Sequence, residues 1–405
     1  MTRRFVFEGL KVADFSWVGV GPITTRYLAD HGATVLRIES TGRPETLRRA
    51  SPFKDNVEGV NRSGYFNNFN ASKYSITLNM AHPRAREVAL RICRWADVLA
   101  ESFRPGVMAK WRLDYESVRE VKPDIIYFST SMQGQTGPRA HVTGFGVQAA
   151  SMAGITYVTG WPDRLPAGPY GAYTDTINPR LAAAAIAAAL DYRRRTGQGQ
   201  HLDLSQYEGA LLFLAPLLMQ YAVNGTEAER AGNRSPCAAP HGAYPCAGDD
   251  RWCAIAVRTD DEWAAFRRVL GDPPWTREER FATLERRLQH TDEMDALVAA
   301  WTSQHPAQEV MRRMQEAGVP AGAALDGRDL LDDPQLAHRR HFPRLDHPEV
   351  GPHSIDALAH RLSKSPPQVR MPAPCLGEHN STAYTGILGF SDEEFVELVA
   401  DGVID

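Results

Sequence analysis

The first part of the chain alternates short apolar runs with amphipathic stretches. Lys11–Phe15 and Thr34–Ile38 are β-like runs, and the segment TTRYLADHG between them has a helical pattern that ends at Gly32. This order predicts a strand–loop–helix–strand unit, which begins a parallel α/β sheet.

The same alternation continues to about residue 223. Further strands are predicted at Ser75–Met80, Ala96–Ser102, Asp124–Ser129 and His201–Ser205, with helices at Pro83–Trp95, Tyr115–Val121 and Leu181–Leu190. The longest apolar run, Gly209–Val223, is predicted to be a buried helix. Since ligands of open α/β sheets bind beyond the carboxyl ends of the strands, we expect a site where the loops after Phe15, Ile38, Ser102 and Ser129 meet.

A second pattern begins near Asn224. A polar segment rich in Gly, Pro and Asn precedes a strand at Trp252–Val257 and amphipathic helices at Asp261–Leu270 and Pro306–Glu316. This segment predicts a smaller α/β domain that extends to about Asp332. The chain is loop-rich after His338 and ends in an acidic helix at Ser391–Val399.

Composition narrows the class of protein. The 405 residues are 43% hydrophobic and 23% charged, which is ordinary for a globular protein with a sizeable core. A formal charge of -4 excludes the strongly basic surface that nucleic-acid or anionic-lipid partners require.

The cysteines and the apolar runs indicate the cellular compartment in which the protein is expected. The five cysteines form no CxxC pair, so reduced thiols are expected and a metal site is not. The N-terminal segment has no apolar run of signal-peptide length, and Pro216 and Gln220 interrupt the Gly209–Val223 run. We expect a cytoplasmic protein without a membrane partner.

Two glycines after the first strand resemble part of a dinucleotide-binding fingerprint. Gly19 and Gly21 have the required spacing, but Thr24 occupies the third glycine position and Pro22 lies where the helix opens. NAD or FAD binding is therefore not expected. The polar segment Arg43–Gly64 is predicted to be a loop over the sheet, whose arginines are candidates for an anionic ligand.

The loop AGPYGAYTDTINPR, residues 167–180, presents Asp175 just before an alanine-rich helix. Aspartate is a favoured helix N-cap, and this is the simplest interpretation. Asn178 followed by Pro179 is also a good cap and first-turn pair. In that case Asp175 is free for another role, and the local pattern leaves both interpretations open.

Ordered motifs add a resemblance to a known family. The segments DFSWVGVGP, ADVLAESFRPG, QGQTGP, RRTGQGQHLDLSQYEGA and MPAPCLGEHN, in this order and spacing, resemble the class III CoA-transferase family, whose sister branch is the α-methylacyl-CoA racemases. The resemblance implies an α/β fold with a Rossmann-like large domain formed by residues 1–224 and 333–405, and an inserted small α/β domain formed by residues 225–332. It also implies an interlocked dimer, either a homodimer or a heteromer with a homologous subunit.

The resemblance implies that Asp175 is the catalytic nucleophile. Its carboxylate would attack an acyl-CoA thioester to give a mixed anhydride, and the CoA thiolate would return to form an aspartyl-CoA thioester before CoA passes to an acceptor acid. A carboxylate is ionised at neutral pH and needs no general base. CoA thioesters are then substrates, and no permanently bound cofactor is expected.

CoA-contacting positions are implied by matching the family's motifs. They are Val18, Gly19, Ser40, Arg43, Leu78, Asn79, Met80, Ala81, Ser102, Phe103, Arg104, Lys110, Thr143, Gly144, Phe145 and Gly146. Cations such as Arg104 and Lys110 suit the CoA phosphates, and Phe103 could flank the adenine.

Several positions depart from formyl-CoA transferase. Ser40 replaces an arginine, so Arg43 or Arg48 is expected to make that phosphate contact. Gly146 and Gly19 replace a glutamate and a glutamine. The four-glycine loop of that enzyme is absent, and Cys237–Tyr244 lies in its region, with His241 and Gly242 as candidate substrate-loop residues. These changes argue against formate and oxalate and suggest a bulkier acid, with a succinyl-CoA donor and an aromatic or dicarboxylic acceptor as a guess.

Two alternatives remain. An acyl-CoA racemase needs a histidine and an aspartate on opposite sides of the α-carbon, but Phe145 occupies the position of the racemase histidine. The other alternative is a non-catalytic subunit of a heteromeric enzyme, which the presence of Asp175 disfavours.

Overall fold

The computed structural model describes residues 5–405, whose contacts divide the chain into two compact units. Of the described residues, the first unit contains 5–156, 168–227 and 335–405, and the second contains 157–167 and 228–334. Each unit has its own hydrophobic core.

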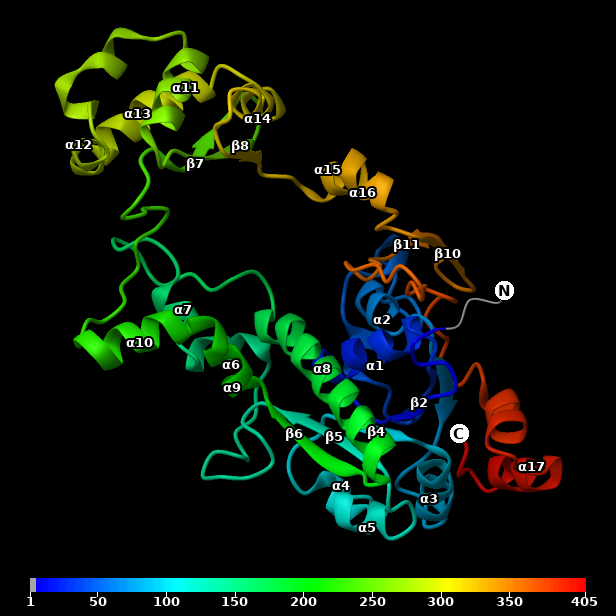
Figure 1. Cartoon of the computed structure of the whole chain (residues 1–405). Helices are drawn as coiled ribbons and strands as arrows, with labels where there is room; N and C mark the ends of the chain where they lie inside the picture. The colour runs from blue at the N-terminus through cyan, green and yellow to red at the C-terminus, as the bar shows by residue number, and fades with distance from the viewer. Residues whose placement is uncertain (1–4) are drawn as a thin grey trace. The chain divides into compact units, whose positions relative to one another are not determined.

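The first unit is built on a parallel sheet that has six strands within residues 5–405 (Figure 1). Its strands are β1 (Lys11–Asp14), β2 (Thr34–Glu39), β3 (Tyr74–Thr77), β4 (Val98–Glu101), β5 (Ile126–Ser131) and β6 (Gln200–Ser205). Their order, β3-β2-β1-β4-β5-β6, is that of doubly wound sheets, and the direction of winding reverses between β1 and β4. The strands predicted from the apolar runs are confirmed.

Helices cover both faces of this sheet. The helical segments of its first 224 residues are α1 (Val20–Asp30), η1 (Thr46–Arg49), η2 (Lys54–Asn56), α2 (Gly64–Phe69), α3 (Ala85–Trp95), α4 (Val107–Lys110), α5 (Tyr115–Arg119), α6 (Gly146–Met152), α7 (Ile155–Val158), α8 (Tyr173–Thr196), α9 (Gln206–Leu211), η3 (Leu212–Leu214) and α10 (Ala215–Asn224). On one face α1 and α8 pack together, and residues such as Leu28 and Ile186 join Val98 in the core. On the other face α3 supplies Val88 and Ile92.

The C-terminal segment returns to the edge of the sheet beside β3. It contains the hairpin β10 (Arg344–His347) and β11 (Gly351–Ser354), α16 (Pro334–Arg339), the π-helical segment η6 (Thr382–Ile387) and α17 (Asp392–Ala400). The His379 N–H donates to Ser75 O at 3.0 Å, and the Asn79 N–H donates to Val403 O at 2.9 Å. Tyr384 is fully buried against the same core.

The second unit packs helices against a small antiparallel sheet. Its elements are β7 (His241–Pro245), β8 (Trp252–Ala256), α11 (Asp260–Leu270), η4 (Pro274–Arg277), η5 (Glu279–Phe281), α12 (Leu284–Gln289), α13 (Thr291–Thr302), α14 (Ala307–Glu316), β9 (Ala321–Ala323) and α15 (Gly327–Leu331). Phe266, Phe281 and Met294 are fully buried in its core.

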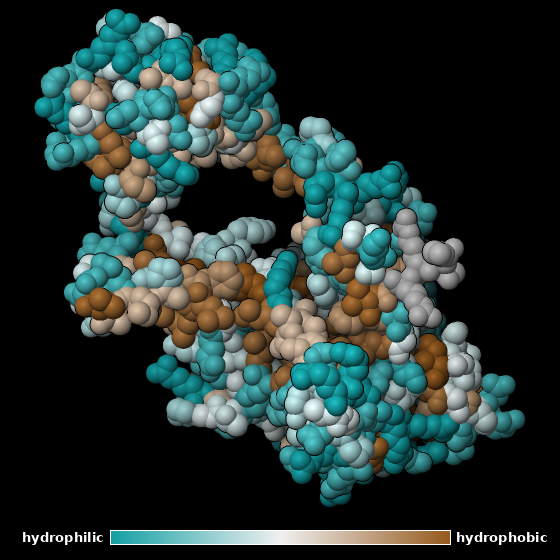
Figure 2. Space-filling view, viewed as in Figure 1, coloured by the Kyte–Doolittle hydropathy of each residue, from teal (hydrophilic) through white to brown (hydrophobic). Residues whose placement is uncertain are grey.

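The prediction of a buried helix at Gly209–Val223 is wrong. The run is divided into α9, η3 and α10, because Pro216 is suited to the first turn of a new helix. Leu218, Met219 and Tyr221 of α10 are 49%, 59% and 58% exposed. Figure 2 shows apolar side chains gathered over this part of the surface. No helix formed by residues 5–405 is both long and apolar enough to cross a membrane.

Candidate active site

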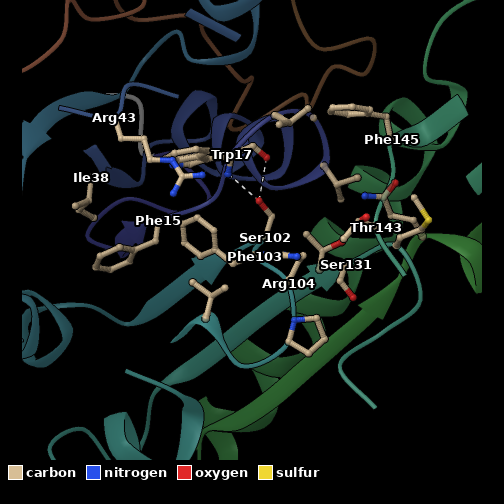
Figure 3. A pocket seen from close by; sticks show the side chains of 18 of the residues that line it. Phe15, Trp17, Ile38, Arg43, Ser102, Phe103, Arg104, Ser131, Thr143 and Phe145 are labelled. Carbon is tan, nitrogen blue, oxygen red and sulfur yellow. Dashed lines mark hydrogen bonds between the residues drawn. The ribbon is translucent and has the colours of Figure 1, made fainter. Parts of the chain in front are cut away.

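A cavity of about 560 Å³ lies beyond the carboxyl ends of the strands, where the loops after β1 and β4 meet. Ser102 joins these two loops: its Oγ accepts from the Trp17 N–H at 2.7 Å and donates to Trp17 O at 2.9 Å (Figure 3). The cavity therefore occupies the point where the winding of the sheet reverses, which is the usual ligand site of such folds.

Three aromatic side chains form a row along the cavity wall. The Trp17 and Phe103 ring centroids are 5.7 Å apart, and those of Phe103 and Trp111 are 5.3 Å apart, both edge to face. The Arg43 guanidinium lies 5.6 Å from the centre of the Trp17 ring, beside Trp17 in Figure 3. A flat base and an anionic group would both find partners on this wall.

Most residues that the motif match implied line this one cavity. They are Val18, Gly19, Ser40, Arg43, Leu78, Asn79, Met80, Ala81, Ser102, Phe103, Arg104, Thr143, Gly144, Phe145, Gly146 and Asp175. Lys110 differs, because it is exposed at the end of α4 and is not part of the lining. His241 and Gly242 belong to the second unit, where they open strand β7 and so are not loop residues.

Sequence reasoning missed other lining residues. Phe15, Trp17, Trp111, Thr130, Ser131, Met132 and Gln206 also face the cavity. Phe15 and Thr130 lie at the carboxyl ends of β1 and β5, so the strand positions alone were a signal that could have found them. Trp111 comes from the segment after β4, and no local pattern marks it.

Asp175 is the third residue of α8, which begins at Tyr173. Both predicted caps, Asp175 and Asn178, are therefore wrong: the N-cap is Ala172, and Asp175 is part of the first turn. Pro179 is inside the helix, and because proline has no N–H, the helical hydrogen bond to Asp175 O is absent. The Asp175 N–H itself donates to Ala172 O at 2.9 Å.

Two glycines from other segments enclose the Asp175 side chain. A Cβ added at Gly19 would lie 2.6 Å from Asp175 Cβ, and one added at Gly146 would lie 2.8 Å from Asp175 Oδ1. Neither position can carry a side chain without displacing the carboxylate. In this chain, glycine at these two positions leaves the space that the Asp175 side chain occupies.

Burial raises the pKa of Asp175 to about 6. The side chain is only 9% exposed, and loss of hydration disfavours its charged form. The first turn of a helix favours negative charge, but here the burial effect is larger. The carboxylate is consequently ionised above about pH 6 and poorly hydrated.

The loop after β1 has a strained conformation beside Asp175. Val18 has φ of 66°, which is unfavourable for a β-branched residue. Its N–H donates to Glu45 Oε1 at 2.8 Å, and the Arg37 guanidinium donates to Ser16 O. Arg37 Nη2 lies 3.6 Å from Glu45 Oε2, and both side chains are fully buried.

This pair belongs to a buried ion network that also contains Asp14, Glu39, Arg48 and Lys73. Arg48 Nη2 donates to Glu39 Oε2 at 2.8 Å and has no exposed surface. The prediction that Arg48 could contact a CoA phosphate is therefore wrong, whereas Arg43 is exposed and lines the cavity. Ser40 lines the cavity too, but its Oγ donates to Asp405 Oδ2 at 2.7 Å.

A second cavity, of about 930 Å³, shares part of its lining with the first. Val18, Gly19, Phe145 and Asp175 line both, so the carboxylate lies in a wall common to the two. The rest of its lining includes five largely apolar side chains, Phe53, Tyr65, Phe69, Val350 and Ile355. Within residues 5–405, no group of three His, Cys, Asp or Glu side chains is placed to bind a metal ion.

Comparison with known proteins identifies the family. Residues 7–380 match the sequence model of CoA-transferase family III. The chain is 32% identical over 397 residues to succinyl-CoA--D-citramalate CoA-transferase from Chloroflexus aurantiacus, covering 98% of both chains. It is 35% identical over 334 residues to acetyl-CoA:oxalate CoA-transferase from Acetobacter aceti, covering 82% of this chain and 84% of that one.

A solved structure agrees with this result. The crystal structure of a CAIB/BAIF family protein from Brucella suis is similar with a TM-score of 0.88 and 31% identity, covering 95% of this chain and 100% of that one. A match to the family over nearly the whole chain, and relatives above 30% identity over most of it, show that this chain belongs to the class III CoA-transferases.

Proposed function

We propose that this enzyme transfers CoA from an acyl-CoA donor to a carboxylic acid through covalent intermediates on Asp175. The observation that carries the proposal is the buried Asp175 carboxylate, enclosed by Gly19 and Gly146 in a wall shared by two cavities. Asp175 is the single residue to which we assign a catalytic role. Because its carboxylate is poorly hydrated, attack on a thioester is favoured.

The proposed steps balance without a general acid or base. An Asp175 oxygen attacks the thioester carbonyl carbon, and the carbon–sulfur bond breaks to give a mixed anhydride and CoA thiolate. The thiolate attacks the Asp175 acyl carbon, which releases the donor acid and leaves an aspartyl-CoA thioester. The acceptor carboxylate then displaces the thiolate to form a second anhydride, and the thiolate attacks the acceptor's carbonyl, regenerating Asp175.

We assign CoA to the first cavity. Its aromatic row, Trp17, Phe103 and Trp111, suits the adenine, and the cations Arg43 and Arg104 suit the phosphates. Exclusion of water from Asp175 would protect an anhydride from hydrolysis.

We extend this proposal to the acyl-CoA donor and to the oligomeric state. A succinyl-CoA donor is supported by the name of the Chloroflexus aurantiacus relative, and an aromatic or dicarboxylic acceptor remains our expectation from the sequence. We also propose an interlocked dimer, supported by the exposed apolar side chains of α10, which a second chain would cover. A homologous partner subunit is the alternative to a homodimer.

Trapping the covalent intermediate tests the mechanism. The protein is incubated with succinyl-CoA and hydroxylamine, and modified peptides are mapped by mass spectrometry. A hydroxamate on Asp175 is expected, together with loss of CoA exchange in Asp175→Asn. Asp191→Asn, on the exposed side of the same helix, serves as the control and should retain exchange.

Full exchange activity in Asp175→Asn would refute the mechanism. Deuterium incorporation at the α-carbon without CoA exchange would instead indicate a racemase. The lining of the first cavity does not favour that reaction, because it contains Phe145 and, within the described chain, no histidine.

A further inference from the structure

We propose that the second cavity receives the CoA-accepting acid and that Asn67 selects acids carrying a hydroxyl group. This inference rests on the proposed CoA transfer at Asp175 and specifies its acceptor. The cavity is suited to the purpose because Asp175 lies in its wall, so an acid held there has its carboxylate beside the reacting group.

Asn67 is the unusual feature of this cavity. It lies in α2 and lines the cavity, and it is only 1% exposed. Neither Nδ2 nor Oδ1 of its carboxamide has a hydrogen-bond partner among the described residues. A buried amide without partners destabilises the folded chain, and such groups are rare in native proteins. A ligand that supplies both an acceptor and a donor would satisfy it.

The neighbouring asparagines have hydrogen-bond partners, so the unpaired carboxamide is particular to Asn67. The side chain of Asn68 accepts from the Asp356 N–H at 3.2 Å, and Asn70 Nδ2 donates to Phe66 O at 3.1 Å. Three asparagines therefore lie within four positions. Asn67 and Asn68 both line the cavity, and Asn67 is the one whose buried carboxamide lacks a partner.

His353 adds a second group with the same property. Its Nδ1 lies 3.0 Å from Gly351 O, and because a carbonyl oxygen only accepts, Nδ1 carries the proton. In the neutral ring Nε2 is then an acceptor, and it is buried without a partner. His353 lines the same cavity as Asn67.

The unpaired atoms of Asn67 and His353 are more complementary to a hydroxyl group of the acid than to a second carboxylate. A carboxylate offers acceptors only, which would match Asn67 Nδ2 but leave Asn67 Oδ1 and neutral His353 Nε2 unpaired. A hydroxyl accepts from Asn67 Nδ2 and donates its single proton to Asn67 Oδ1 or to His353 Nε2, so it satisfies more of these atoms than a carboxylate does. The cations in the lining, Lys54 and Arg62, lie 3.2 Å and 3.4 Å from the one carboxylate of Asp55, which offsets only one of their two charges, so the lining keeps a positive charge for an anionic acid.

Matched acceptor acids test the inference. Initial rates of CoA transfer from succinyl-CoA are compared for lactate and propionate, 3-hydroxybutyrate and butyrate, and 3-phenyllactate and 3-phenylpropionate, with glutarate as the dicarboxylate. We expect at least one hydroxylated acid to exceed its partner by tenfold or more in kcat/KM, and to exceed glutarate.

Variants assign the preference to Asn67. Asn67→Leu, which has a similar volume, should reduce the hydroxyl preference to less than threefold while the KM for succinyl-CoA is unchanged. Its melting temperature should not fall, because the change removes unpaired polar atoms. Asn70→Leu is the matched control: it removes a buried, paired carboxamide that does not line the cavity, so it should lower the melting temperature and retain the preference.

Each other outcome overturns the inference. Equal rates within every pair, or an unchanged preference in Asn67→Leu, would show that Asn67 does not read a hydroxyl. A lower melting temperature or dissociation of an oligomer in Asn67→Leu would assign the carboxamide to contacts within or between chains. Failure of the proposed function is distinct, because no acid would then receive CoA and no hydroxamate would form on Asp175.

Discussion

The chemistry proposed for Asp175 depends on what surrounds a single carboxylate. Glycine at positions 19 and 146 allows two backbone segments to approach it within van der Waals distance. The segments remove water from the carboxylate and so raise its pKa. The same approach that makes the group reactive also makes its charged form costly to the fold.

This balance predicts opposite pH effects on activity and stability. The pKa of Asp175 is raised from 3.8 to about 6, so the nucleophile becomes protonated as the pH falls through 6. We expect kcat/KM to decrease about tenfold for each pH unit below that value. A pH–rate profile between pH 4.5 and 8.5 measures this effect, and a flat acid limb would contradict it.

The stability effect has the reverse sign. Since the folded state holds the Asp175 proton more tightly than the unfolded chain does, stability is lost as the pH rises from 3.8 to 6. Asp175→Asn should therefore stabilise the protein at pH 8 by up to about 3 kcal/mol, and by little near pH 4. Thermal unfolding at the two pH values tests this, with Asp191→Asn as the control.

At the scale of single residues, the sequence could indicate Asp175 as a candidate nucleophile but not the residues that enclose it. The local pattern favoured the cap interpretation without excluding a free carboxylate, and the ordered motifs were needed to favour the second. The predicted start at Asn178 was wrong because proline is a good first-turn residue, whereas here Pro179 is accommodated inside the helix. Distances between Asp175 and Gly19 or Gly146 arise from tertiary packing, which no local pattern contains.

Among the elements, the loop between β1 and α1 carries the largest local strain in the site. Val18 is held at positive φ by Glu45, which follows β2, and Glu45 is in turn paired with Arg37. Neighbouring strands thus position this loop through fully buried charges. Such networks are sensitive to the loss of one member, because a buried charge is left without its partner.

Glu45→Ala tests this arrangement. We expect the free energy of unfolding to fall by about 3–5 kcal/mol, and the KM for the CoA thioester to rise because Val18 and Gly19 line the CoA cavity. Chemical denaturation and steady-state kinetics measure the two effects. Glu116→Ala removes an exposed ion pair with Arg119 in α5 and should cost no more than about 1 kcal/mol; equal effects of the two variants would contradict the role of Glu45.

Apolar periodicity predicted the strands of the large sheet well, because each buried strand must be apolar. It could not reveal the buried arginines. Arg37 lies within the apolar run of β2, and Arg48 lies in the polar segment 43–64, which resembles a solvated surface. Only the arrangement of β2 beside β1 and η1 pairs them with Glu39 and Glu45. The assignment of Arg48 to a phosphate failed for that reason.

For the whole molecule, the exposed face of α10 predicts association. Leu218, Met219, Tyr221 and Val223 are between 49% and 71% exposed, an apolar surface that favours burial by another chain. We expect light scattering to give twice the mass of one chain. Leu218→Glu should weaken this dimer and lower activity.

Val396→Glu is the matched control, since Val396 is 63% exposed on α17. It should leave the mass unchanged. An active monomer at assay concentrations would contradict the proposed dimer. The sequence alone suggested the opposite environment for α10, because a continuous apolar run is typical of a helix buried within its own chain.

The position of Asp175 in a wall common to two cavities has a consequence for inhibition. A stable CoA thioether joined by a short spacer to a hydroxy acid would fill both cavities as one molecule. Binding of its first half would raise the effective concentration of the second, so its affinity should exceed that of either half alone. Because its thioether is not cleaved, such a bisubstrate compound would not be turned over. It would therefore suit structure determination of the site with both cavities occupied.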